Sequence, residues 1–144
     1  MRGYILVVDD QPPIRFVFEE ILRQAGYMTK SAANGLECLK IARSEDKPLL
    51  ILLDYQMPSL TGIEVLSRLK REKTTQGIPV IMVTGTEDIE EIAKEKGADA
   101  VLAKPPDLEQ LQQIVQKTQG STKHEQRPDL QSCYTTCLIP MIPT

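Results

Sequence analysis

The sequence predicts an α/β fold in which a five-stranded parallel sheet lies between two layers of helices. Two observations predict it. Short apolar runs alternate with amphipathic stretches from residue 4 to about residue 117, in five successive β-α units. The most apolar run, residues 49–53, is continuous rather than alternating, which is typical of a strand that is covered on both faces.

The boundaries of the predicted elements come from apolar spacing and from residues that start or stop helices. The predicted strands cover residues 4–8, 27–32, 49–53, 78–83 and 100–103. The predicted helices cover residues 14–25, 35–44, 62–69, 87–96 and 108–115. Gly26 and Gly97 each follow a helical pattern and are expected to end it. Thr61 and Glu64 have the spacing of a capping box, which predicts a helix start there.

Length and composition limit the kinds of protein that this chain can be. A chain of 144 residues with 41% hydrophobic and 26% charged residues has the size and composition of one globular domain. Its net charge of −3 argues against nucleic acid as a main partner, because phosphate backbones select clustered Lys and Arg. Three cysteines at irregular spacing do not suggest a disulfide framework. No apolar stretch has the length of a signal peptide core or a membrane span, so we expect a cytoplasmic protein with no membrane partner.

Polar side chains stand directly after four of the predicted strands. In chain order they are Asp9 and Asp10, Asp54, Thr84 and Lys104. In doubly wound sheets the carboxyl ends of the strands form the ligand-binding edge, so we expect these side chains to converge there. Each of them alone would be an ordinary loop residue or helix cap. Their combination predicts a site.

The chemistry of three clustered carboxylates calls for a cation. Two like charges about 4 Å apart repel by roughly 4 kcal/mol at an effective dielectric constant of 20. Mg²⁺ relieves this repulsion, because it prefers oxygen ligands and leaves positions free for water and phosphate. With the metal bound, Asp54 can stay ionised and attack phosphorus as a nucleophile. Lys104 and Thr84 could then take part of the charge on the phosphoryl oxygens.

The residues at these positions resemble the receiver domain of bacterial two-component response regulators. The resemblance rests on Asp9-Asp10, residues 52–58, Gly62, Thr84-Gly85 and Lys104-Pro105. It covers about residues 4–117 and implies a flavodoxin-like three-layer sandwich with strand order 2-1-3-4-5. We therefore expect a receiver domain at residues 1–118 and a poorly ordered tail at residues 119–144, with no output domain.

The resemblance also implies a role for each acidic residue. Asp54 would accept a phosphoryl group from the phosphohistidine of a sensor histidine kinase or a histidine phosphotransferase. Asp10 and Asp54 would bind Mg²⁺ together with the backbone carbonyl of Gln56, and Asp9 would act through metal-bound water. Mn²⁺ could take the place of Mg²⁺.

The resemblance further implies that Lys104 and Thr84 bind the phosphoryl oxygens and that Pro105 follows a cis peptide bond. One residue departs from the family pattern. Val101 stands three residues before the lysine, where the family usually has Tyr or Phe. An aliphatic side chain cannot make the aromatic movement that couples to the threonine. Gly85 leaves room for a partner beside the site, so both residues favour a carrier that passes its phosphoryl group on.

The segment from Asp9 to Arg15 resembles most closely the single-domain intermediates of sporulation phosphorelays. On this interpretation an apolar surface around the site would bind a helical, histidine-bearing partner, and the protein would be a monomer or a weak dimer. The residues expected on that surface are Ile14, Val17, Gly85, Pro105 and Pro106.

Two other functions stay open at this point. One is a Mg²⁺-dependent phosphatase or phosphotransferase with an aspartyl-phosphate intermediate, although such enzymes usually carry two aspartates in one Asp-x-Asp loop after the first strand. Here the two acids after the first strand are adjacent, and the predicted nucleophile follows the third. The other is a receiver-like module that binds proteins without phosphorylation. We expect a phosphoacceptor signalling protein that only phosphorylates and dephosphorylates itself and is not a turnover enzyme.

Overall fold

The computed structural model describes residues 3–86, 88–104 and 108–123, with the side chains of Leu108 and of residues 119–123 left out of the description. The strands are β1 (Ile5–Val8), β2 (Thr29–Ala32), β3 (Leu50–Asp54), β4 (Val80–Thr84) and β5 (Ala100–Ala103). The helices are α1 (Pro12–Gln24), α2 (Gly35–Arg43), α3 (Gly62–Arg71), α4 (Ile89–Glu95) and α5 (Leu108–Lys123). Strands and helices alternate along the whole described chain, as the apolar pattern predicted.

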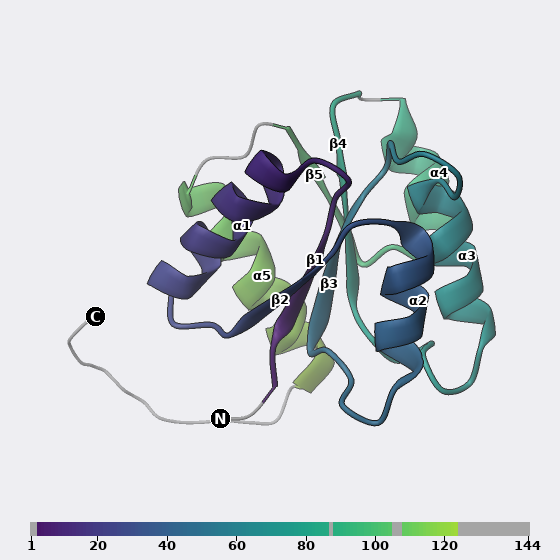
Figure 1. Cartoon of the computed structure of the whole chain (residues 1–144), viewed down its shortest axis with the longest axis horizontal. Coiled ribbons are helices and arrows are strands. Elements are labelled where there is room, and N and C mark those ends of the chain that lie inside the picture. The colour runs from purple at the N-terminus through teal and green to yellow at the C-terminus, as the bar shows by residue number, and fades with distance from the viewer. Residues whose placement is uncertain (1–2, 87, 105–107, 124–144) are drawn as a thin grey trace.

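The five strands form one parallel sheet in the order β2-β1-β3-β4-β5. Helices α1 and α5 cover one face of the sheet, and α2, α3 and α4 cover the other (Figure 1). The predicted three-layer sandwich and its strand order are therefore confirmed. Both faces are covered because right-handed crossovers place their helices on opposite faces when the strand order changes direction: β1 to β2 runs one way across the sheet, and β2 to β5 runs the other way.

Alternate side chains of the central strands supply two separate cores. Leu6 and Val8 of β1 point to the α2–α4 side, whereas Ile5 and Val7 point to the α1/α5 side. The β3 residues divide in the same way, and all of these side chains are almost fully buried. The continuous apolar run of β3 thus has the expected cause, since every position in it faces one of the two helix layers.

The predicted helix boundaries are confirmed where capping chemistry defined them. Thr61 caps α3 as expected: its hydroxyl accepts a hydrogen bond from the Glu64 backbone N–H at 3.3 Å, and the Glu64 carboxylate accepts one from the Thr61 N–H at 2.9 Å. Gly26 ends the turn after α1 with a φ of 98°, a left-handed conformation that favours glycine. Among the described helices, none has the length and hydropathy of a membrane span.

Several element boundaries differ from the prediction, among them the start of α1, the start of β2 and the end of α5. Helix α1 begins at Pro12, because proline is suited to the first helical turn, where its missing N–H is not needed. Strand β2 begins at Thr29, whereas Tyr27 packs beside the α1/α5 core without strand pairing. Helix α5 continues to Lys123, so it crosses the predicted domain boundary at residue 118. Extending an existing helix by a few residues costs little, even without apolar periodicity. Residues 124–144 lie outside the described residues.

Candidate functional site

The register of the sheet brings the predicted site residues to one edge. Val8 of β1 pairs with Leu53 of β3, so Asp9 and Asp54 come next on adjacent strands. On the other side of β3, Asp54 pairs with Val83, directly before Thr84 at the end of β4. Thr84 in turn pairs with Ala103 of β5, and the Lys104 N–H donates to the Thr84 carbonyl at 2.9 Å. Four strand ends therefore meet where the sequence predicted them.

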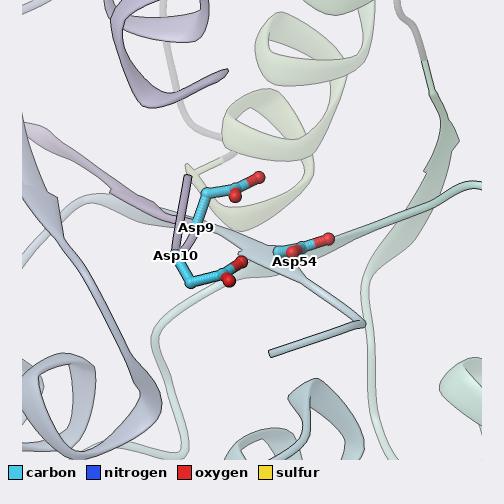
Figure 2. A group of neighbouring side chains, drawn as sticks. All are labelled: Asp9, Asp10 and Asp54. Atoms are coloured by element: carbon cyan, nitrogen blue, oxygen red, sulfur yellow. The ribbon is translucent and has the colours of Figure 1, made fainter. Parts of the chain in front are cut away.

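Three carboxylates form an acidic cluster at this edge, which consists of Asp9, Asp10 and Asp54 (Figure 2). One carboxylate oxygen of each residue lies within 4.8 Å of the others. Asp9 and Asp54 are only 2% and 3% exposed, whereas Asp10 is open to solvent. Two acids are thus held at the floor of the site and one at its rim.

Lys104 makes ion pairs with both buried acids. Its Nζ lies 2.8 Å from Asp54 Oδ1 and 3.4 Å from Asp9 Oδ2. Partial burial lowers the pKa of Lys104, but the hydrogen bond and the charge of Asp54, together with the charge of Asp9, outweigh this effect and raise it. The ammonium form is therefore favoured, and one cation of the chain itself lies between two carboxylates.

The nucleophile candidate is less easily ionised than an exposed aspartate. Burial raises the pKa of the Asp54 carboxyl, and the nearby charge of Asp9 acts in the same direction. The hydrogen bond with Lys104 and one from the backbone N–H of Gln56 lower it, yet the pKa stays above its ordinary value. An additional cation at the cluster would favour the ionised form of Asp54.

The donor set fits a divalent cation such as Mg²⁺. All three side chains offer carboxylate oxygens, the ligand type that Mg²⁺ prefers. Their 4.8 Å spread is close to the roughly 4 Å that separates oxygens on opposite sides of one Mg²⁺ ion. Gln56, whose backbone carbonyl is the predicted further ligand, lies in the exposed loop two residues after Asp54. No other described group of three His, Cys, Asp or Glu side chains has a comparable geometry.

The loop after β1 is fixed by contacts that the sequence did not indicate. The Asp9 carboxylate accepts a hydrogen bond from the Gln11 backbone N–H at 2.9 Å. The carbonyl oxygen of Asp9 accepts one from Arg15 Nη1 at 2.6 Å, from one turn inside α1. A basic residue six positions after an acid has no recognisable pattern, so only the fold reveals this contact.

Thr84 is buried at the end of β4, and its hydroxyl is already occupied. Thr84 Oγ1 accepts a hydrogen bond from the Thr86 backbone N–H at 3.1 Å and lies 3.3 Å from Thr86 Oγ1. Between them, Gly85 is exposed, and a Cβ added there would meet no atom within 4 Å. Gly85 therefore lies in open space next to Thr84.

The start of α3 packs tightly against the backbone at the end of β3. The Gly62 N–H donates to the Tyr55 carbonyl at 2.9 Å. A Cβ added at Gly62 would overlap the Asp54 carbonyl oxygen and lie 2.8 Å from the Tyr55 Cα. Glycine is thus required at position 62 because the backbone of the nucleophile itself fills the space.

The predicted partner-surface residues differ in their surroundings. Val17 on α1 is 51% exposed, whereas Ile14 is half-buried and packs against the α1/α5 core. Pro105 and Pro106, and with them the predicted cis peptide bond, lie outside the described residues.

Val101 occupies the position where the family pattern has an aromatic side chain. It is half-buried on β5, packs against the α2–α4 core and lines a cavity of about 310 Å³ with Ile114 of α5.

Comparisons with known proteins agree with this geometry. A family model for the response regulator receiver domain matches residues 5–116. Sporulation initiation phosphotransferase F of Bacillus subtilis is 41% identical over 119 residues, which cover 81% of this chain and 94% of that protein. The polar-differentiation response regulator DivK of Brucella anthropi is 36% identical over 107 residues, 73% of this chain and 86% of that one.

Solved structures are similar in fold. A putative response regulator from Chloroflexus aurantiacus has a TM-score of 0.79 at 28% identity, over 83% of this chain and 99% of that one. The receiver domain of the sensor histidine kinase PA1611 from Pseudomonas aeruginosa has a TM-score of 0.76 at 28% identity, with the same two coverages. That structure holds a magnesium ion coordinated in its active site cleft.

Proposed function

Because this chain belongs to the family of response regulator receiver domains, we propose that Asp54 accepts a phosphoryl group from a phosphohistidine in a two-component or phosphorelay pathway. One observation carries the proposal: Lys104 Nζ contacts Asp54 Oδ1 at 2.8 Å and Asp9 Oδ2 at 3.4 Å. These contacts put a nucleophilic carboxylate, an ammonium and a second acid at one point of the sheet edge.

In this proposal each residue has one task during transfer. A carboxylate oxygen of Asp54 attacks phosphorus, a P–O bond forms, and the P–N bond to the donor imidazole breaks. The imidazole keeps the electron pair of that bond and takes up a proton. The Lys104 ammonium already hydrogen-bonds Asp54, and after transfer it would bind an oxygen of the phosphoryl group on Asp54. The Thr84 hydroxyl would give up its contacts with Thr86 and donate a hydrogen bond to a second phosphoryl oxygen.

The cofactor of the proposed reaction is Mg²⁺, for which Mn²⁺ could substitute. Asp10 and Asp54, with the backbone carbonyl of Gln56, would hold it, and Asp9 would act through water. When bound, the ion offsets the charges of the carboxylates and of the phosphoryl oxygens. The three clustered carboxylates support this assignment, because they offer oxygen ligands within 4.8 Å of one another.

The direct test is an intact-mass measurement after incubation with acetyl phosphate and Mg²⁺. The wild-type chain should gain the mass of one phosphoryl group, and Asp54→Ala should gain none. Asp46→Ala is the matched control, since the exposed Asp46 carboxylate forms an ion pair only with Lys30 among the described residues. This variant should be labelled like the wild type. Labelling of Asp54→Ala to the wild-type level would overturn the proposal.

We further propose that the chain is a phosphoacceptor that does not turn over an external substrate. In the aspartyl-phosphate hydrolase pattern, nucleophile and acid share one loop after the first strand. Here Asp54 ends β3, and Asp9 and Asp10 follow β1. Incubation with phosphomonoesters separates the two classes, because a hydrolase would release phosphate in sustained turnover, whereas a receiver would release it no faster than its own acyl phosphate hydrolyses.

We propose that the chain acts as a carrier between a sensor histidine kinase and a histidine phosphotransferase. The 41% identity with a sporulation phosphotransferase, over 94% of that protein's length, supports this role. Val101 in place of an aromatic residue and the open space at Gly85 support it too. Ile14 and Val17, with Pro105 and Pro106, would form the partner surface.

Val17 offers the sharper test of that surface, because Ile14 also packs against the core. Val17→Asp should slow transfer from a phosphorylated sensor histidine kinase by about tenfold or more, as expected for an anchor in an interface. Labelling by acetyl phosphate should be unaffected. Met28→Asp is the control, since Met28 is 66% exposed in the loop between α1 and β2, beside the start of β1. Equal loss of both reactions in Val17→Asp would contradict the assignment.

The proposal includes a cytoplasmic monomer or weak dimer without a nucleic acid or membrane partner. The net charge of −3 supports the exclusion of nucleic acid. Size-exclusion chromatography with light scattering, with and without acetyl phosphate, measures the oligomeric state in both forms.

A further inference from the structure

Asp10 differs from the other acids of the cluster in how it is held. Asp9 and Asp54 are buried and both contact Lys104. The Asp10 carboxylate is exposed and makes no hydrogen bond or ion pair with any other described residue. Its position therefore depends on the backbone that carries it, which is the peptide unit that joins Asp9 to Asp10.

That peptide unit is held from one side by α1. Arg15 Nη1 donates a hydrogen bond of 2.6 Å to the Asp9 carbonyl oxygen, the acceptor of this peptide. The preceding peptide is held by β2, since the Asp9 N–H donates to the Ala32 carbonyl at 3.2 Å. The Gln11 carbonyl accepts from the Arg15 backbone N–H at 3.1 Å, so both ends of Arg15 are tied to the same loop.

We propose that Arg15 is a positioning residue for the metal site: it fixes the Asp9–Asp10 peptide and thereby aims the Asp10 carboxylate at the cation. The inference rests on the proposed function, in which Asp10 is a metal ligand. A charge-assisted hydrogen bond is among the stronger polar contacts, and guanidinium is a planar donor with a fixed geometry. Rotation of this peptide, which Arg15 prevents, would turn Asp10 away from Asp54.

A positioning role and a simple charge effect of Arg15 predict opposite changes in Mg²⁺ affinity when the side chain is removed. Arg15 is a cation beside a cation site, so through charge alone its removal would strengthen Mg²⁺ binding. Loss of the hydrogen bond to the Asp9 carbonyl would weaken it, because contacts that orient metal ligands typically contribute about 10- to 100-fold in affinity. The direction of the change therefore distinguishes the two roles.

The test is calorimetric titration of Mg²⁺ into the full chain, without a phosphoryl donor. Arg15→Met keeps most of the aliphatic stem but removes the donor and the charge, and should weaken Mg²⁺ binding by about tenfold. Arg15→Lys keeps a charged donor and should stay within a few fold of wild type. Arg23→Met is the matched control, because Arg23 lies on the same helix and pairs with the exposed Glu20. This variant should bind Mg²⁺ with the affinity of the wild type.

A second readout follows the Mg²⁺ dependence of acetyl phosphate labelling. In Arg15→Met the half-saturating Mg²⁺ concentration should rise by a similar factor, with the labelling rate at saturation retained. Urea unfolding identifies a variant that does not fold, and Arg15→Gln then takes its place in both measurements. Equal or tighter Mg²⁺ binding by the charge-free variant would overturn the role of Arg15 while the proposed function stands. Absence of Mg²⁺ binding and labelling in the wild-type chain would overturn both.

Discussion

Gly62→Ala perturbs the backbone of the proposed nucleophile without touching its side chain. Gly62 is the first residue of α3 and lies under the end of β3. A methyl group at this position would overlap the Asp54 carbonyl oxygen and lie 2.8 Å from the Tyr55 Cα. Both obstacles are main-chain atoms of a strand end, so no flexible side chain can move aside. Either the start of α3 or the end of β3 has to shift.

The magnitude follows from two opposing effects. Inserting a methyl group into a packed region typically costs about 1–3 kcal/mol. Replacing glycine by alanine in a helix returns up to about 1 kcal/mol, and less at the first helical position. We therefore expect a net loss of about 1–2 kcal/mol in the free energy of unfolding. With a typical urea m-value of about 1–3 kcal/mol per M, the midpoint should fall by about 1 M.

The assay combines urea unfolding with phosphoryl labelling. Gly62→Ala should lower the unfolding midpoint and also slow labelling by acetyl phosphate, because a displaced Asp54 loses its 2.8 Å contact with Lys104. Gly77→Ala is the matched control, since a Cβ there meets no atom within 4 Å, and its stability should stay within about 0.5 kcal/mol of wild type. If Gly62→Ala proved as stable and as readily labelled as Gly77→Ala, the steric reasoning would be refuted.

Three further predictions concern single side chains. Ser59 has a φ of 70°, so Ser59→Gly should raise the unfolding midpoint by relieving roughly 1 kcal/mol of left-handed strain; a lower midpoint would contradict this. Burial raises the pKa of the Cys38 thiol to about 12, so peptide mapping should find it unmodified by iodoacetamide at pH 8 in the native protein and alkylated in urea. Burial also raises the pKa of Asp54 in the folded state, so ionisation costs stability as pH rises through that pKa. Without divalent cations, Asp54→Asn should therefore be more stable than wild type at pH 7, with the difference shrinking below about pH 4. Added Mg²⁺ should stabilise wild type more than the variant. If the stability difference between variant and wild type did not change between pH 7 and about pH 4, the effect of Asp54 ionisation on stability would be excluded.

The sequence was sufficient to predict the parallel α/β fold class and the residues that form the site. Alternation of apolar runs with amphipathic stretches predicts a parallel sheet, and parallel strands bring Asp9, Asp54, Thr84 and Lys104 to one edge. These inferences succeed because strand period, helix period and edge placement are local properties of the chain. The strand order came from family resemblance, since right-handed crossovers alone permit several orders.

The contacts within the site could not be predicted in the same way. Whether Lys104 pairs with one acid or two depends on the relative height of three strand ends, which is set by packing on both faces. Arg15 reaches the Asp9 carbonyl because of the angle at which α1 leaves β1, and no spacing rule encodes that angle. The extension of α5 to Lys123 was missed because Gly120 and its polar neighbours have weak helix propensity.

The position of β5 at the margin of the sheet has a consequence for how the protein could report the state of its site. Among the described strands it pairs only with β4, and directly after it Lys104 contacts Asp9, which lies 95 residues earlier in the chain. Movement of the ammonium toward or away from the carboxylates therefore acts directly on one edge strand of the sheet. Amide hydrogen exchange along Ala100–Ala103 should thus change when a cation or a phosphoryl group binds at the carboxylates that end or follow the interior strands β1 and β3.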